Sequence, residues 1–235
     1  MNVPIGVITN FFAIFLGGLI GAINYRWIPD KIKVLLPSIF GGCGLALGIT
    51  FIVKVVNLPP VILALIIGTI IGQSLNIEDK LTNFSMRLQT KLQKGSKKVD
   101  EELIARFVTL LVLFSAGNGI ILGSLYEGMT GDTTLLMVKS ILDFFTAIIF
   151  ATSIGYLVMF ISIPTLVVGM TLFYLATIIL PNISDVMTAD FAAGGGILTM
   201  FIGLRMMEVK KLPVANMIPA IILFMPFSYL WTLFF

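Results

Sequence analysis

The sequence predicts an all-α integral membrane protein of about eight transmembrane helices, in which an inverted-topology repeat flanks two central helices. Of its 235 residues, 58% are hydrophobic and only 11% are charged, and the mean hydropathy is +1.07. These values lie far above those of a water-soluble domain. Apolar stretches near twenty residues, which as helices cross roughly 30 Å of hydrocarbon, recur along almost the whole chain. We therefore expect a single transmembrane domain over residues 1–235.

Charged residues and prolines mark where one expected span ends and the next begins. The expected spans are 4–23, 34–54, 59–77, 104–126, 135–160, 163–181, 189–207 and 213–234. The connection at 78–103 is the long polar stretch between them. Its leucine and phenylalanine spacing suits an amphipathic helix at the cytoplasmic membrane surface, carried by Leu81, Phe84, Leu88 and Leu92. The alternative, which we favour, is a solvated helix that links the spans.

Lysine and arginine gather at three places: after the first span, around the long connection and between the last two spans. Short loops rich in these residues stay in the cytoplasm, so all three places face inward and both termini face outward. The outer ends of the spans then hold the cation Lys54 and the acids Glu127, Asp132, Asp185 and Asp190. The net charge of +3 reflects this topology, and we expect no nucleic-acid partner.

Two distant segments of the chain align without a gap. "FGGCGLALGITFIVKVVNLPPVILALIIG" at 40–68 and "GGGILTMFIGLRMMEVKKLPVANMIPAII" at 194–222 keep a constant offset of 154 residues (195 − 41 and 212 − 58). The alignment pairs spans one to three with spans six to eight, and an offset of five spans reverses direction across the membrane. We therefore expect repeat A at about 1–77, the connection at 78–103, central helices at 104–160 and repeat B at 161–235.

Inverted repeats are typical of secondary transporters, in which two pseudo-symmetric halves open one site to alternate sides. Glycine-interrupted helices at matching positions are where unwound backbone binds an ion or solute in such folds. The triple-glycine segments fit this description and supply Gly41, Gly42, Gly195 and Gly196 as candidates. The alternative is close helix packing, which we favour for the four-residue glycine pairs Gly17/Gly21, Gly44/Gly48, Gly68/Gly72 and Gly119/Gly123.

The two central spans carry polar residues inside apolar sequence. Span four contains Ser115 and Asn118 beside glycines, a combination that can loosen the helix. The alternative is an interhelical hydrogen bond of the asparagine. Span five places a polar stripe at helical spacing, made of Lys139, Ser140, Asp143 and Thr146. Because a charge within hydrocarbon is costly, ionisable residues inside a span are functional candidates.

Lys139 and Asp143 are four residues apart, in the order that stabilises a helix less than the acid-first order does. Lys139 lies near the start of the span and can extend toward water, whereas Asp143 lies one turn deeper. A substrate site and a structural ion pair explain this arrangement about equally well. Glu127 and Asp132, in the stretch before the span, are acidic candidates of the outer loop.

The chain has no histidine and a single cysteine, Cys43. It also lacks GxSxG, HExxH, P-loop and dinucleotide motifs. We therefore expect no enzyme activity, no metal site and no cofactor. Two functions remain open: a transporter or channel for a small ion or solute, and a structural or regulatory membrane protein that transports nothing.

The block "ILGSLYEGMTGDTTLLMVKSILDFFTAIIFA" at 121–151 resembles the core of the YqgA/YdfK-like bacterial membrane proteins, or domain of unknown function 554. "NFFAIFLGGLIG", "ALIIGTIIGQSLNIEDKL" and "AAGGGILTMFIGLRMMEVKKLPVANMIPAII" resemble its other blocks in order, so the resemblance covers nearly the whole chain. Core positions follow the family pattern at Gly123, Ser124, Gly128, Gly131, Asp132, Lys139, Ser140, Leu142 and Asp143, and Glu127 stands in place of an aspartate. The resemblance implies a multi-pass protein of the bacterial inner or plasma membrane and is compatible with transport.

The expected partners are few. The lipid bilayer surrounds the helices, and an ion or small solute binds the polar site. A second copy of the chain is a further expected partner, because the glycine-rich faces of spans one to three suit a homodimer.

Overall fold

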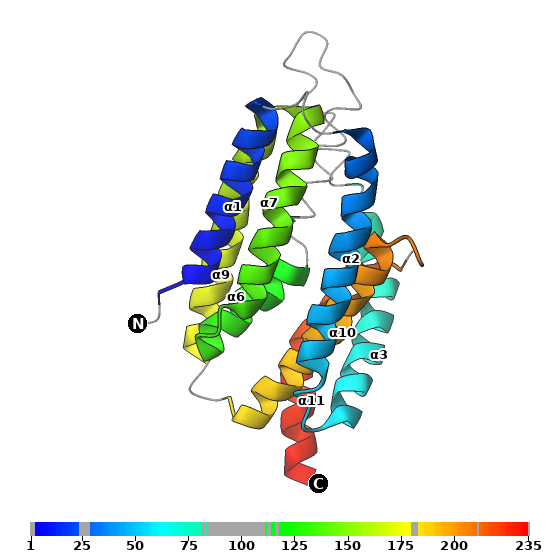
Figure 1. The fold of residues 1–235 in the computed structure, drawn as a ribbon. Helices are drawn as coiled ribbons and strands as arrows, with labels where there is room; N and C mark the ends of the chain where they lie inside the picture. The colour runs from blue at the N-terminus through cyan, green and yellow to red at the C-terminus, as the bar shows by residue number, and fades with distance from the viewer. Residues whose placement is uncertain are drawn as a thin grey trace. The chain divides into compact units, whose positions relative to one another are not determined.

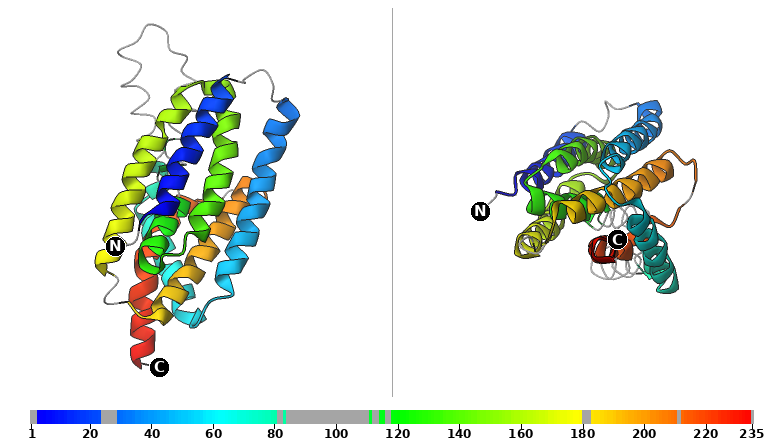
Figure 2. Two further views of the ribbon diagram at one scale, coloured as in Figure 1. Left: turned by 60° about the vertical axis from the view of Figure 1, so that its left-hand side comes forward. Right: turned by 90° about the horizontal axis from the view of Figure 1, so that it is seen from below.

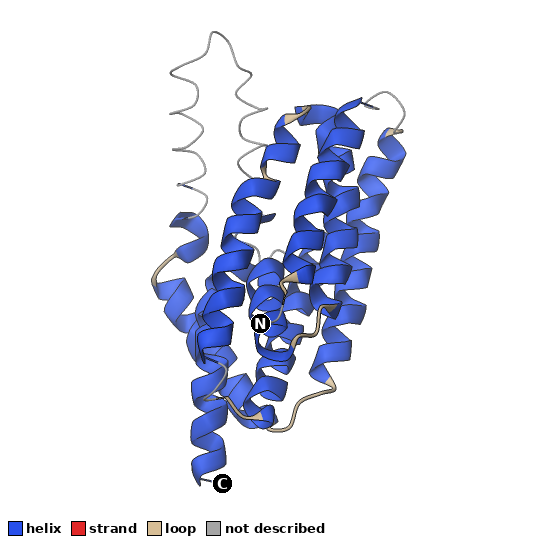
Figure 3. Ribbon diagram, turned by 90° about the vertical axis from the view of Figure 1, so that its left-hand side faces the viewer, coloured by secondary structure: helices blue, strands red, loops and turns tan. Residues whose placement is uncertain are grey.

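A computed structural model describes residues 3–23, 29–80, 83, 111, 114–115, 118–179, 183–210 and 212–234. In this part of the chain the regular elements are helices and no strand occurs (Figure 3). Five of the described helical segments are long and apolar enough to cross a membrane: Ile5–Ile23, Thr134–Thr152, Leu157–Ala176, Asp185–Met206 and Val214–Phe234. Ser38–Ile52 and Leu58–Ser74 are shorter apolar helices. The protein is thus an all-helical membrane protein with several apolar helices.

The helices form two compact units, one of residues 1–34 and 79–174 and one of residues 35–78 and 175–235. The first unit holds α1 (Ile5–Ile23), α6 (Asn118–Thr130), α7 (Thr134–Ile154), α8 (Leu157–Phe160) and most of α9 (Ser162–Ile179) (Figure 1). The second holds most of α2 (Asp30–Ile52), then α3 (Leu58–Ser74), α10 (Asp185–Met206), η2 (Val214–Met217) and α11 (Ile218–Phe234).

In the first unit α1 lies along α7, as two views of the ribbon show (Figure 2). Glycines of α1 meet successive parts of α7: Gly6 meets Leu136, Gly17 meets Phe144 and Gly21 meets Ile148. The residue numbers rise together, so the two helices run parallel. A Cβ at Gly21 would lie only 2.2 Å from the backbone oxygen of Ile148. The absent side chains therefore let the two backbones touch, as expected for glycine pairs in membrane helices.

In the second unit α2 crosses α10 and α3 crosses α11. Gly41 meets Gly203 and Gly48 meets Gly196, so the numbers rise on α2 as they fall on α10, and the two helices run antiparallel. α3 is likewise antiparallel to η2 and α11, because Gly68 meets Ala220 whereas Gly72, further along α3, meets the earlier residue Asn216. The packing predicted for Gly44/Gly48 and Gly68/Gly72 is therefore present.

The expectation of unwound backbone at the triple glycines is wrong. α2 runs unbroken through Gly41 and Gly42, and α10 runs unbroken through Gly195 and Gly196. Tight packing explains Gly41 and Gly196, which face the partner helix, whereas a Cβ at Gly42 would meet no atom within 4 Å. A helical backbone keeps its carbonyls in internal hydrogen bonds, so these glycines do not expose them.

The expected fifth span, 135–160, runs too far. α7 ends at Ile154 because Gly155 takes a left-handed φ of 72°, a conformation that glycine adopts at no steric cost. Residues 157–160 instead form α8 and continue into the next apolar segment. Pro164 does not mark the boundary, because it lies in the first turn of α9, where no helical N–H is lost.

Asp190 is buried near the start of α10 and does not lie in a loop. Its Oδ1 accepts hydrogen bonds from the backbone N–H groups of Val56 at 3.0 Å and Asn57 at 2.8 Å, just before α3. Its Oδ2 accepts the hydroxyl of Ser228 on α11 at 2.6 Å. One buried carboxylate of α10 thus joins the start of α3 to α11, which compensates the cost of burying it.

Arg205 and Glu78 form an ion pair of 2.9 Å at the other end of this unit. The Asn216 side-chain oxygen accepts the backbone N–H of Glu78 at 2.7 Å. These contacts hold the first residues of the polar connection against α10 and η2. The amphipathic helix expected at 78–103, with Leu81, Phe84, Leu88 and Leu92, lies for the most part outside the described residues.

Candidate functional site

Asp143 lies in the contact between α7 and α1. Its side chain is buried, with the residue 8% exposed. It is the tenth residue of α7, so it lies about 14 Å along the helix at 1.5 Å per residue, near the middle of a span. Asn10 of α1, which is 0% exposed, donates from Nδ2 to Asp143 Oδ2 at 2.7 Å. A carboxylate near the middle of a membrane helix thus faces another helix of the same unit.

Lys139, one turn earlier on α7, forms an ion pair with the same Oδ2 atom. The sequence order makes this the less favourable i, i+4 pair for a helix, yet the burial of both groups favours it over separate charges. The Lys139 Nζ also lies 5.7 Å from the ring centre of Phe114, within cation–π range. The ammonium of Lys139 is therefore close to both a carboxylate and an aromatic ring.

Gly119 of α6 makes room for the lysine. A Cβ there would lie 3.2 Å from Lys139 Cδ and 3.4 Å from Cε, so the aliphatic stem passes over the glycine backbone. Lys139 therefore packs across α6 instead of extending along α7 toward water. Its side chain is 12% exposed, like that of Asp143.

Two buried polar atoms of the first unit have no hydrogen-bond partner among the described residues: Asn10 Oδ1 and Ser124 Oγ. Asn10 uses its amide nitrogen for Asp143 and leaves its carbonyl oxygen unpaired. Ser124 of α6 faces Gly169 of α9, whose Cβ would lie 3.3 Å from the hydroxyl. Buried polar atoms without partners are rare in folded proteins.

Glu127 occupies a buried position in α6 and is only 1% exposed, so its assignment to an outer loop is wrong. Its Oε1 accepts the backbone N–H of Gly6 at 2.7 Å and its Oε2 accepts that of Val7 at 3.3 Å. These two donors belong to the first turn of α1, which has no helical acceptors for them. The carboxylate thus caps α1 at the positive end of the helix dipole.

Replacing Glu127 with alanine is expected to destabilise the protein by about 2–3 kcal/mol, because two buried backbone donors lose a charged acceptor. Glu127→Gln keeps one acceptor oxygen and loses less than half as much. Chemical unfolding of both purified variants measures the difference. Equal stability of Glu127→Ala and the parent protein would contradict the capping role.

The other polar residues predicted on span five turn to their own helix. Ser140 Oγ donates to the Leu136 carbonyl at 2.6 Å, and Thr146 Oγ1 donates to the Leu142 carbonyl at 2.7 Å. Neither side chain has a described hydrogen bond to Asp143. The predicted polar residues lie on α7, but among them Asp143 is the one with a described hydrogen bond to another helix, to Asn10 of α1.

The remaining candidates divide between this unit and other places. Ser115 forms a hydrogen bond of 2.9 Å with Thr165 of α9. Asn118 begins α6, and its side chain lies outside the described residues. Asp132 lies in the loop between α6 and α7 as predicted, where its Oδ1 accepts the backbone N–H of Thr134 at 2.8 Å. The four glycine candidates belong to the second unit.

Sequence reasoning missed Asn10, the residue of α1 that binds Asp143. The sequence could have indicated it, because Asn10 is an amide inside an apolar span and such residues usually form a hydrogen bond with another helix. Ser124 and Thr165 carry weaker signals, since a hydroxyl in a membrane helix often bonds its own backbone. In the described part of the chain, no three Asp, Glu or Cys side chains gather as a metal site would require.

Known proteins resemble this chain over nearly its whole length. A family model described as "Protein of unknown function (DUF554)" matches residues 5–229. The chain is 43% identical over 232 residues to "Uncharacterized protein YqgA" of Escherichia coli (strain K12), covering 98% of this chain and 99% of that protein. It is 28% identical over 224 residues to "Uncharacterized membrane protein YdfK" of Bacillus subtilis (strain 168), covering 93% of each. No solved structure matches the chain. The family predicted from the sequence blocks is thereby confirmed.

Proposed function

Within the DUF554 family, to which this chain belongs, we propose that the protein is a secondary transporter or channel for a small ion or solute. The observation that carries the proposal is the buried carboxylate of Asp143, which shares one oxygen between Lys139 and Asn10 near the middle of α7. Asp143 is the proposed binding group for the transported species. Lys139 neutralises it while the site is empty.

A purely structural role explains this pair less well. Ionised groups inside a membrane are costly, and replacing a buried ion pair by apolar residues is often neutral or stabilising. Apolar side chains would therefore hold α1 against α7 at least as well. Lys139 also has a long, flexible stem that lets its ammonium leave the carboxylate. These features suit a site that exchanges one positive group for another.

Helix directions within each unit support the eight-span topology that we propose with this function. Eight alternating spans require α1 parallel to α7, α2 antiparallel to α10 and α3 antiparallel to α11. The glycine contacts show these three relations. With this alternation, the basic connections face the cytoplasm of the bacterial cell and both termini face outward.

The packing of the second unit supports an inverted repeat. In the alignment offset by 154 residues, α2 corresponds to α10 and α3 to α11. A two-fold axis in the membrane plane makes corresponding helices antiparallel, and helices close to that axis cross their own counterparts. Both pairs cross in this way, at Gly48 with Gly196 and at Gly68 with Ala220. Two such halves provide the alternating access that transport requires.

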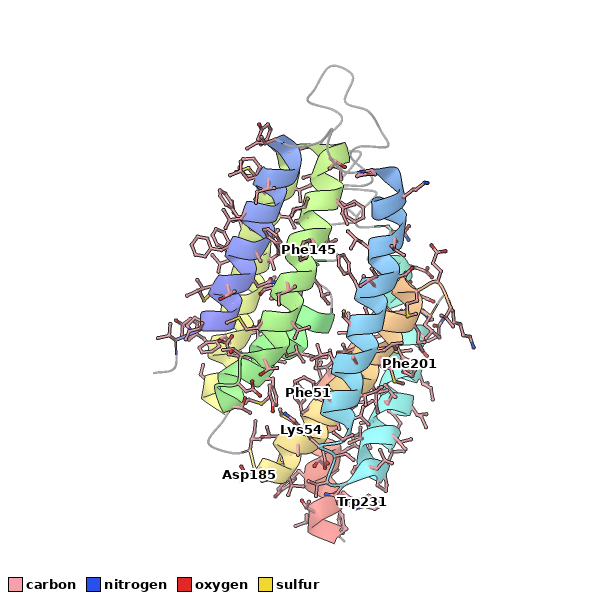
Figure 4. The ribbon with its side chains drawn as sticks, viewed as in Figure 1. Phe51, Lys54, Phe145, Asp185, Phe201 and Trp231 are labelled. Carbon is pink, nitrogen blue, oxygen red and sulfur yellow. The ribbon has the colours of Figure 1, made fainter. Side chains whose placement is uncertain are left out.

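The test is flux through liposomes that contain the purified full-length protein, screened with small ions and solutes. Flux in Asp143→Asn is expected to fall by about tenfold or more, because an amide lacks the charge that binds the substrate. Asp185→Asn is the matched control, because it makes the same change at an exposed position in the first turn of α10 (Figure 4). Unchanged flux in Asp143→Asn would remove that residue from the mechanism.

The second candidate function is a structural or regulatory membrane protein that transports nothing. The observation that favours it is that the Asp143 carboxylate already has two partners, Lys139 and Asn10. Absence of flux for every species screened, with the protein folded in the liposomes, would select this function.

A further inference from the structure

We infer that the site at Asp143 binds a small monovalent cation, an alkali ion or ammonium, in the place that the Lys139 ammonium occupies. The inference rests on the proposed function, because it names the ligand class of the same site. It follows from the charge of the site, the oxygen atoms around it and the packing of Lys139.

The charge of the site matches one positive charge. Asp143 contributes one carboxylate, and Lys139 already balances it with a single ammonium group. The other buried acid of this region, Glu127, is bound to the backbone of α1. A divalent ion would leave an excess positive charge in a membrane interior, which is costly. The face of Phe114, 5.7 Å from Lys139 Nζ, adds the quadrupole attraction that favours a weakly hydrated cation.

Asn10 supplies the second oxygen. Its amide is 0% exposed and its Oδ1 has no partner among the described residues, although a buried carbonyl oxygen normally has one. Rotation of the amide would bring Oδ1 to the Asp143 side in place of Nδ2. A cation held between the Asn10 carbonyl and the Asp143 carboxylate would then satisfy both oxygens, as carbonyl oxygens do in cation pathways.

The lysine occupies this place as an internal competitor. Its stem rests against the backbone of Gly119, where an added Cβ would be 3.2 Å from Cδ. That distance is tight enough that the lysine must shift when a methyl group is added. The packing therefore provides a way to weaken the hold of Lys139 without removing either charge.

The experiment measures the thermal unfolding midpoint of the purified full-length protein in detergent. The salts are sodium, potassium and ammonium chloride, and choline chloride at equal ionic strength is the control for screening. A ligand that binds the native state raises the midpoint. Lys139→Gln is expected to respond to at least one small cation at concentrations about tenfold or more below those needed by the parent protein, because its carboxylate has lost its counter-charge.

Two further variants keep the result interpretable. The pair Lys139→Gln/Asp143→Asn has two neutral amides and is expected to respond to the small cations no more than to choline. Gly119→Ala retains both charges and is expected to shift the response in the same direction as Lys139→Gln, by a smaller factor. If Lys139→Gln does not fold, Gly119→Ala decides the outcome.

Three results would overturn the inference. Choline could stabilise Lys139→Gln as well as the small cations do, the neutral pair could respond equally, or a lower pH alone could stabilise Lys139→Gln without any dependence on the cation. If a neutral solute is transported in a way that depends on Asp143, and no cation raises the unfolding midpoint, the cation site is wrong but the transport function is supported. If a small cation raises the unfolding midpoint but no flux is detected, the cation site is supported and the transport function is wrong.

Discussion

Replacing Lys139 with methionine is expected to destabilise the protein by about 3–5 kcal/mol, because removal of one partner leaves the other charge buried and uncompensated. The Asp143 side chain is only 12% exposed, so water replaces little of what the ammonium provides. Asn10 continues to donate to Oδ2, which retains one hydrogen bond but no counter-charge. Chemical unfolding of the purified protein measures the loss.

The double variant Lys139→Met/Asp143→Leu separates the pair from the loss of one partner. It is expected to recover most of the stability lost in Lys139→Met, because both charges leave the membrane interior together. Lys210→Met, at an exposed position after α10, is the matched control and is expected to leave the unfolding transition unchanged. A Lys139→Met protein as stable as its parent would show that water reaches Asp143 and that the carboxylate is not buried.

Gly21→Ala is the second substitution with a large expected effect, about 2–3 kcal/mol of lost stability, which is typical of overpacking a close contact. The new methyl group would lie 2.2 Å from the Ile148 backbone oxygen. Since the obstacle is backbone, α1 has to move away from α7. The same unfolding measurement applies.

Gly42→Ala is the matched control for that substitution. A Cβ at Gly42 meets no atom within 4 Å, so the change adds no clash and improves helix propensity by roughly 0.5–1 kcal/mol. The two variants should therefore change stability in opposite directions. Equal destabilisation by both would indicate that an added methyl group is unfavourable even where it meets no atom, and would contradict the contact between α1 and α7 as the cause at Gly21.

Periodicity and charge were sufficient to predict several parts of this fold. Spacings of three and four residues place Asp143 on one face of its helix, because the α-helix repeats every 3.6 residues. The cost of burying a charge then marks that face as one that contacts protein. Four-residue glycine spacing similarly predicted close packing at Gly17 and Gly21, and the structure shows that the partner helix is α7. These inferences need only one helix at a time.

The partner of Asp143 could not be predicted in this way. Asn10 is 133 positions distant in the chain, and periodicity shows which face is polar but not which helix lies opposite it. The placement of Glu127 in an outer loop was wrong for a related reason. A glutamate usually ends a span, yet here α6 continues to Thr130 because the carboxylate finds two free N–H donors on α1.

Backbone conformation accounts for the remaining differences. Gly155 ends α7 through its left-handed φ, but glycine is frequent within membrane helices, so its position alone does not mark an end. At the triple glycines the sequence predicted a break where the helix continues, because small residues allow either unwinding or close packing. On α2 and α10 the helices stay unbroken, with Gly41 and Gly196 packed against the partner helix. Phe51 and Lys54 lie at the C-terminal end of α2 (Figure 4).

Flux through liposomes that contain the Lys139→Met/Asp143→Leu variant would test whether Asp143 binds the transported species. The variant removes both charges together, while Asn10 loses the acceptor of its amide nitrogen, which costs about 1–3 kcal/mol. The expected result is a folded protein with flux reduced to that of protein-free liposomes. Parental flux in the folded variant would show that Asp143 does not bind the transported species and would assign the pair a structural role.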